Sequence, residues 1–221
     1  RLHAVGQLCK RASARPVVDE ALRTEQGFAA LDTALQFVAH AFEHRAGMVT
    51  KAEVRALALA RLGPGTGDLI WDVGCGSGSV AIECARLGAA AIAVDRDPEA
   101  IALTARNAAT HGVPVQVVHG AAPAALDALP DPDAVFVGGG ATGPLLEACW
   151  AALVPGGRLV VHGVTVETEV LLHEARARFG GSMTRIAVED LDAIGSFHGW
   201  KPARSIVQWS VEKPVTQTDS E

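Results

Sequence analysis

The segment LIWDVGCGSG at Leu69–Gly78 decides the fold of this 221-residue chain. Apart from Asp72, its first five residues are apolar and suit a buried, pleated strand. Three glycines at alternate positions then let the backbone turn sharply and approach a ligand without a Cβ in the way. Residues 79–87 continue as a predicted helix whose first N–H groups face the same space. The segment therefore predicts a strand, a glycine loop and a helix that together bind a nucleotide-like cofactor.

The spacing of the glycines indicates which cofactor is bound. Gly74-x-Gly76-x-Gly78 differs from the dinucleotide fingerprint G-x-G-x-x-G, because Ser79 stands where that fingerprint has its third glycine. A diphosphate is therefore less favoured than S-adenosylmethionine (SAM), which has none. Asp95 ends the next predicted strand, where a carboxylate can accept hydrogen bonds from both hydroxyls of a ribose.

Three segments are expected to meet at this site, because ligands bind outside the carboxyl ends of parallel strands. They are Asp72 with the loop that includes Cys75 and Ser77, then Asp95, and then the loop 120–122 after the third strand. Asp72 has two interpretations. It either contacts the amino group of SAM, directly or through water, or serves only as a structural cap for the loop.

Strand and helix patterns alternate on both sides of the loop and predict an α/β fold. Thr50 and Glu53 have the spacing of a capping box that starts a helix ending near Leu62. The expected strands are 69–73, 91–95, 115–118, 134–137, 158–162, 184–188 and 205–211, and the later helices are 79–87, 98–111, 124–129 and 144–153. We predict a doubly wound, mostly parallel seven-stranded sheet that ends in an antiparallel hairpin of two strands joined by a loop.

Composition and charge exclude several classes of function. The net charge of −6 is spread along the chain, and no run of Lys and Arg is long enough to follow a phosphate backbone, so nucleic acid is not an expected partner. No apolar run reaches the roughly 18 residues of a membrane helix. The four cysteines lack C-x-x-C spacing, which argues against a metal site and fits a reducing cytoplasm.

The chain divides into one main domain and two flanking segments. We expect residues 1–42 to be an N-terminal extension, or a linker from a missing upstream domain, with apolar residues at helical spacing between 19 and 42. Residues 43–212 form the predicted SAM-binding domain, and residues 213–221 a polar tail.

The order of motifs resembles one family in particular. In sequence they are GMVTKAEVR from Gly47, WDVGCGSGSVAIE from Trp71, AVDRDPEAI from Ala93, HGAAPAAL from His119, FVGGG from Phe136 and VPGGRLVVHGVTVETE from Val154. A G-x-G-x-G motif alone indicates only the Rossmann-like class I SAM-dependent methyltransferases. The full set resembles the decarboxylating precorrin-6B methyltransferases of cobalamin biosynthesis, both the stand-alone form and the C-terminal half of the fused precorrin-6Y C5,15-methyltransferases.

This resemblance implies an activity and a set of site residues. The implied reaction transfers a methyl group from SAM to carbon 15 of a tetrapyrrole and removes the carboxyl of the acetate on carbon 12. The implied SAM contacts are Thr50, Gly74 to Gly78, Asp95 and Ala122. The resemblance also implies a homotetramer and a fusion to an upstream carbon-5 methyltransferase domain. Two positions depart from the family: Ala121, where many members have an acid, and His162, where asparagine is common.

The chemistry of the implied tetrapyrrole substrate indicates which residues would bind it. A tetrapyrrole with many carboxylates needs local cations, and Lys51, Arg55 and Arg204 flank the entry helix or the terminal hairpin; each also fits a solvated surface charge. Gly138, Gly139 and Gly140 leave room for a bulky planar ring. His162 could donate a proton during decarboxylation and Glu167 could orient it, although a lone histidine at a strand end also fits a structural role. No metal is required.

Two other interpretations stay open at this stage. One is a class I methyltransferase for a different small molecule or for a protein. The other, from a different class, is a noncatalytic module that binds SAM or a dinucleotide within a larger chain.

Overall fold

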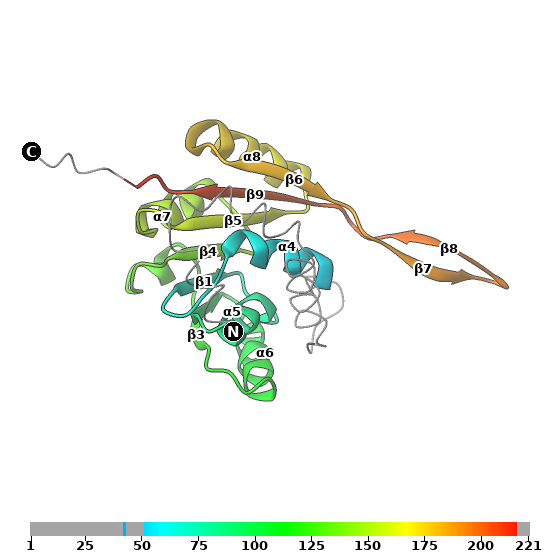
Figure 1. The fold of residues 1–221 in the computed structure, drawn as a ribbon, viewed down its shortest axis with the longest axis horizontal. Helices are drawn as coiled ribbons and strands as arrows, with labels where there is room; N and C mark the ends of the chain where they lie inside the picture. The colour runs from blue at the N-terminus through cyan, green and yellow to red at the C-terminus, as the bar shows by residue number, and fades with distance from the viewer. Residues whose placement is uncertain (1–41, 43–50, 216–221) are drawn as a thin grey trace, which may run out of the picture.

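The computed structural model describes Phe42 and residues 51–215 and shows an α/β body from which a slender arm extends (Figure 1). The body contains a seven-stranded sheet in the order β3-β2-β1-β4-β5-β9-β6. Its strands are β1 (Leu69–Val73), β2 (Ala90–Asp95), β3 (Gln116–His119), β4 (Ala134–Val137), β5 (Arg158–Gly163), β6 (Ser182–Ile186) and β9 (Ile206–Glu212). The helices are α4 (Ala52–Leu62), α5 (Ser79–Arg86), α6 (Pro98–Thr110), α7 (Gly143–Ala152) and α8 (Val166–Phe179).

Helices cover both faces of the sheet because both faces of its central strands are apolar. Strands β1 to β5 pair in parallel, and β9 runs antiparallel between β5 and β6. Successive side chains of a strand point to opposite faces. Ile70 and Phe136 accordingly pack in a cluster with α4 and α5, whereas Trp71 and Val135 pack in the cluster that contains α7 and α8. The predicted doubly wound, mostly parallel sheet is confirmed.

The body follows the sequence pattern closely. Strands β1 and β4 have the expected bounds, and Asp97 caps α6 by accepting a hydrogen bond from the backbone N–H of Glu99 at 2.9 Å. The helix expected at 124–129 is wrong, since only a short 3₁₀ turn, η1 (Ala124–Leu126), forms there. Helix α8 was not expected from the sequence. It buries only Leu172 and Ala175, so it shows little apolar periodicity.

The start of α4 differs from the expected capping box. The helix begins at Ala52 with Lys51 at the N-cap, which makes no side-chain cap. Glu53 is then the second helical residue, one position short of the place from which a capping-box acid reaches back to the N-cap. Thr50 and the predicted helical pattern before Phe42 lie outside the described residues.

The segment between the last two sheet strands is a hairpin, not the expected loop. Strands β7 (Glu189–Ile194) and β8 (Phe197–Pro202) form a separate two-stranded ladder, which we call the arm. Figure 1 shows the arm extending away from the body. The large apolar side chains of the arm are exposed, and they are Leu191, Ile194, Phe197 and Trp200. Among the described residues, no helix is long and apolar enough to cross a membrane.

Candidate active site

The glycine loop is held to the body by hydrogen bonds from neighbouring elements. The backbone N–H of Gly74 donates to the carbonyl of Val94 at 2.9 Å, and the side-chain amide of Asn107 donates to the carbonyl of Ser77 at 2.9 Å. Gly78 has a φ of 72°, and a Cβ on it would collide with the side chain of Thr104. Only glycine fits this position, so the loop has one well-defined shape.

Asp95 shapes the loop and closes it against the end of β2. One carboxylate oxygen accepts a hydrogen bond from the N–H of Gly76 at 3.0 Å, and the other accepts one from the N–H of Asp97 at 2.9 Å. An ionised carboxylate has further lone pairs, so both oxygens can still accept hydrogen bonds from a ribose. The structure thus brings Asp95 to the glycine loop, as the sequence indicated.

Asp72 lies beneath the loop and has unused hydrogen-bonding capacity. Its Oδ2 accepts a hydrogen bond from the N–H of Ala81 in the first turn of α5 at 3.0 Å. Its Oδ1 is buried and has no hydrogen-bond partner among the described residues. Burial raises the pKa of Asp72 to about 7, and the charge of Asp95 adds to this rise. Asp72 therefore fixes the first turn of α5 beneath the loop, and its Oδ1 has no partner in the described part of the chain.

The remaining predicted cofactor residues have different environments. Cys75 is buried, with its sulfur 3.5 Å from the hydroxyl of Thr104, and burial raises the pKa of the thiol far above its usual value. This thiol is inert at neutral pH. Ala122 is half-buried and packs against the core cluster on the α7 and α8 side. Thr50 lies outside the described residues.

The three glycines after β4 leave an open surface beside the loop. Gly138 lies against the loop, because a Cβ on it would come within 3.1 Å of the carbonyl oxygen of Gly74. Gly139 and Gly140 are exposed, and a Cβ on either would meet no heavy atom within 4 Å. Strands β1 and β4 are neighbours in the sheet, so the glycine loop and this open surface lie side by side.

His162 is enclosed in the body. It is 4% exposed, its Nε2 lies 2.9 Å from Oε1 of Gln208 on β9, and its ring packs edge-on against Phe136 at 4.8 Å between centroids. Burial lowers the pKa of His162. At neutral pH a histidine of this kind is mostly neutral and a poor proton donor. Gln208 was not predicted as a site residue, because no sequence pattern around it indicates its partner.

Glu167 is separate from His162. It is exposed in the first turn of α8, where hydrogen bonds from its own backbone and from Thr165 lower the pKa of its carboxyl. No hydrogen bond between Glu167 and His162 is present in the described part of the chain. The residue that orients His162 is Gln208. The expected contact between Glu167 and His162 is not observed among the described residues.

The three predicted substrate cations occupy contrasting positions. Lys51 pairs with Asp190 of the arm, and Arg204, which follows the arm, is exposed. Arg55 instead is 2% exposed and lies over the ring of Phe42 at 4.8 Å. Burial lowers the pKa of Arg55, and the charge of Glu83 opposes this effect. A guanidinium that is buried in this way packs inside the body and does not reach a substrate. We therefore do not place Arg55 in the substrate site.

The fold and this site define the class of protein. The strand order, the glycine loop after β1 and the acid at the end of β2 are those of class I SAM-dependent methyltransferases. No group of three metal-ligating side chains occurs among residues 42 and 51–215.

Comparison with known proteins narrows the class to a family. Residues 40–213 match the family model described as a precorrin methyltransferase domain, and the chain belongs to this family. It is 48% identical over 176 residues to the precorrin-6Y C(5,15)-methyltransferase [decarboxylating] of a Sinorhizobium species, covering 78% of this chain and 42% of that protein. The chain therefore spans less than half the length of this relative.

Two solved structures are similar over nearly their whole length. The C-terminal domain of precorrin-6Y C5,15-methyltransferase from Rhodobacter capsulatus is 41% identical, with a TM-score of 0.74, and the match covers 78% of this chain and 94% of that one. The precorrin 8W decarboxylase from Methanobacterium thermoautotrophicum is 31% identical, with a TM-score of 0.72, and the match covers 77% of this chain and 96% of that one.

Proposed function

We propose that this chain transfers a methyl group from SAM to carbon 15 of a precorrin-6B-type tetrapyrrole and removes the carboxyl of the acetate on carbon 12, a step of cobalamin biosynthesis. The observation that carries the proposal is the glycine loop closed by Asp95 beside the open surface at Gly138 to Gly140, within a family match over residues 40–213. The loop suits the cofactor, and the open surface suits a large planar substrate.

The described residues fit SAM in three places. Asp95 would accept hydrogen bonds from the ribose, and the loop from Gly74 to Gly78 lets the cofactor lie against the backbone. The buried Oδ1 of Asp72 is the acceptor left for the ammonium group, directly or through water. We also propose contacts from Ala122 and Thr50. When bound, SAM supplies an electrophilic methyl group.

In this proposal the protein's main contribution is to hold the accepting carbon of the substrate in line with the sulfur–methyl bond of SAM and to exclude water. Gly138 to Gly140 would face the macrocycle, and Lys51 and Arg204 would bind its carboxylates. During decarboxylation the bond to the carboxyl carbon breaks, carbon dioxide leaves and the conjugated ring takes up the electron pair. A proton then completes the methyl group on carbon 12. Because His162 is buried and neutral, we do not assign this proton to it, nor a role to Glu167.

Mass spectrometry after incubation with precorrin-6B and SAM tests the proposal. The expected product gains one methyl group and loses one carbon dioxide. Gly139→Val tests the substrate surface, because the valine side chain would enter open space and leave the fold intact. It would block the tetrapyrrole ring. This variant should bind SAM as tightly as the wild type and lose methylation. Methylation without loss of carbon dioxide would contradict the coupled reaction, and an unaffected Gly139→Val variant would contradict the substrate surface.

We further propose that the chain assembles in the cytoplasm as a homotetramer through the face of the arm that carries Leu191 and Trp200, opposite the face of Asp190. We also propose that it belongs to a longer enzyme with an upstream carbon-5 methyltransferase domain. The exposed apolar side chains of the arm support the assembly. The short coverage of the Sinorhizobium relative supports the longer enzyme. Light scattering should give four times the mass of one chain, and a Leu191→Ser, Trp200→Ser double variant should give a smaller species. A monomeric wild type would refute the assembly.

A further inference from the structure

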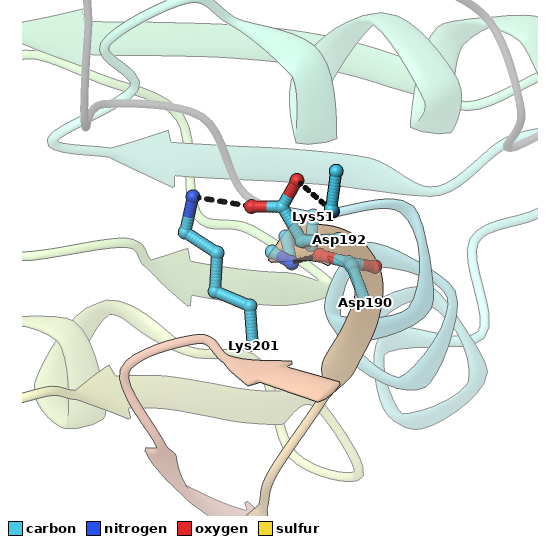
Figure 2. A network of polar contacts seen from close by, with 5 residues as sticks. Lys51, Asp190, Asp192 and Lys201 are labelled. Carbon is cyan, nitrogen blue, oxygen red and sulfur yellow. Dashed lines mark hydrogen bonds and ion pairs between the residues drawn. The ribbon is translucent and has the colours of Figure 1, made fainter. Parts of the chain in front are cut away.

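One ion pair joins the arm to the start of α4, and a second ion pair lies beside it within the arm. Lys51 Nζ contacts Asp190 Oδ2, and Lys201 Nζ donates to Asp192 Oδ2 at 2.8 Å (Figure 2). Asp190 and Lys201 are directly opposite each other in the β7–β8 ladder. The two cations and two anions thus form one cluster, and their side chains are between 36% and 73% exposed.

This charge cluster lies at the same edge of the body as the glycine loop. Gly163 at the end of β5 pairs with Val207, and Ile186 at the end of β6 pairs with Ile206, so the arm leaves the sheet at the carboxyl ends of these strands. Helix α4 runs the other way. Gly63 follows the last turn of α4, and its carbonyl accepts a hydrogen bond from Arg158 at the start of β5. The end of α4 therefore lies at the amino ends of the strands, and Lys51, at the start of α4, lies toward the carboxyl edge.

The ion pairs of the cluster are exposed and therefore weak. Solvent-exposed pairs of this kind contribute about 0 to 1 kcal/mol. The N-terminus of a helix also favours an anion over a cation, so the ammonium of Lys51 beside the start of α4 needs a carboxylate nearby. Asp190 supplies that carboxylate within the chain. A ligand that carries several carboxylates could supply it equally well.

We propose that Asp190 and Asp192 are exchangeable counterions, which hold Lys51 and Lys201 until carboxylates of the substrate replace them. The arm would then be released from α4 as the substrate binds. The class of ligand, a polycarboxylate tetrapyrrole, rests on the proposed function. The exchange itself rests on the exposure of the four side chains and on their place at the carboxyl edge.

Titration calorimetry with uroporphyrin, a tetrapyrrole with a carboxylate on every side chain, tests the exchange. Asp190→Asn and Asp192→Asn should each bind this probe about two- to fivefold more tightly than the wild type, the range set by the strength of exposed ion pairs. Glu189→Gln is the matched control. It removes the same charge from the same strand, but the side chain of Glu189 points to the other face of the ladder.

The control separates exchange from general repulsion of an acidic ligand. At about 0.15 M salt the charge of Glu189 is largely screened, so Glu189→Gln should bind the probe like the wild type. The gain from Asp190→Asn should also vanish when Lys51 is replaced by Met, because the two side chains act on each other. If Asp190→Asn and Asp192→Asn bind no more tightly than Glu189→Gln, the exchange is overturned.

The outcome is distinguishable from failure of the proposed function. If precorrin-6B is methylated while the aspartate variants match Glu189→Gln, the enzyme assignment stands and the exchange is wrong. If the aspartate variants bind the probe more tightly while precorrin-6B is not methylated, the exchange stands and the proposed substrate is wrong.

Discussion

Two tryptophans nine residues apart show how the body and the arm differ. Trp209 in the body is fully buried, and its indole N–H donates to the carbonyl of Gly180 at 2.9 Å. Trp200 in the arm is 68% exposed. Both lie on strands with regular ladders, so backbone pairing alone does not determine burial. The body buries its apolar residues within one chain, whereas the arm presents them outward.

Replacing each tryptophan by alanine tests this difference in burial most directly, and it has the largest expected effect on stability. Trp209→Ala should lower the free energy of unfolding by about 3 to 5 kcal/mol, because it leaves a large cavity and an unpaired carbonyl. Trp200→Ala should change it by less than about 0.5 kcal/mol in a single chain, because this side chain is exposed. Urea unfolding at low protein concentration measures both. Equal losses would show that the arm is as integral to the single chain as the body.

Within the body, two glycines near the proposed cofactor site differ in the space around them. A Cβ on Gly78 would collide with Thr104, whereas a Cβ on Gly139 would enter open space. Gly78→Ala should cost about 2 to 4 kcal/mol, because it combines a positive φ with a collision against Thr104, and it should weaken SAM binding. Gly139→Ala should be nearly neutral, since its Cβ meets nothing within 4 Å. Thermal unfolding with and without SAM compares them. A tolerated Gly78→Ala would contradict the loop geometry.

A third prediction concerns His162, a polar residue that the body encloses. His162→Ala should cost about 2 kcal/mol by leaving Gln208 unpaired, while the ratio of decarboxylation to methylation should not change. The pKa of His162 is lowered on folding, so the unfolded chain takes up the proton first. The wild type should therefore lose stability as the pH falls below 6.5, and the variant should not show this loss. A selective loss of decarboxylation would make His162 the proton donor.

The smallest expected effect is the pH dependence of SAM binding. Asp72 has a pKa of about 7 in the folded chain, and only its ionised form attracts an ammonium group. SAM affinity should thus rise about eightfold between pH 6 and pH 7.5, following the ionised fraction. Calorimetry with Asp72→Asn supplies the reference, because the cofactor's own titration is common to both proteins. Parallel pH profiles would remove Asp72 from the cofactor site.

The body was more predictable from the sequence than the arm. Strand β1 and the loop were predictable because alternating glycines have few conformations and the strand is continuously apolar. Helix α8 and the arm were not, because α8 buries few residues and the arm buries few of its apolar side chains in its own chain. The burial of Arg55 was also unpredictable. Its surroundings include Phe42 and Glu83, which lie far from it in sequence.

The sequence by itself determined the parallel strands β1 to β5, the positive-φ glycines of the loop and the acid at the end of the second strand, since these depend on local backbone conformation and on periodic burial. Only the tertiary structure decided which groups meet across the chain. It placed Gln208 beside His162, Asp190 beside Lys51 and open space around Gly139. Such contacts depend on how distant segments pack, because hydrogen bonds and ion pairs form wherever packing brings their partners together.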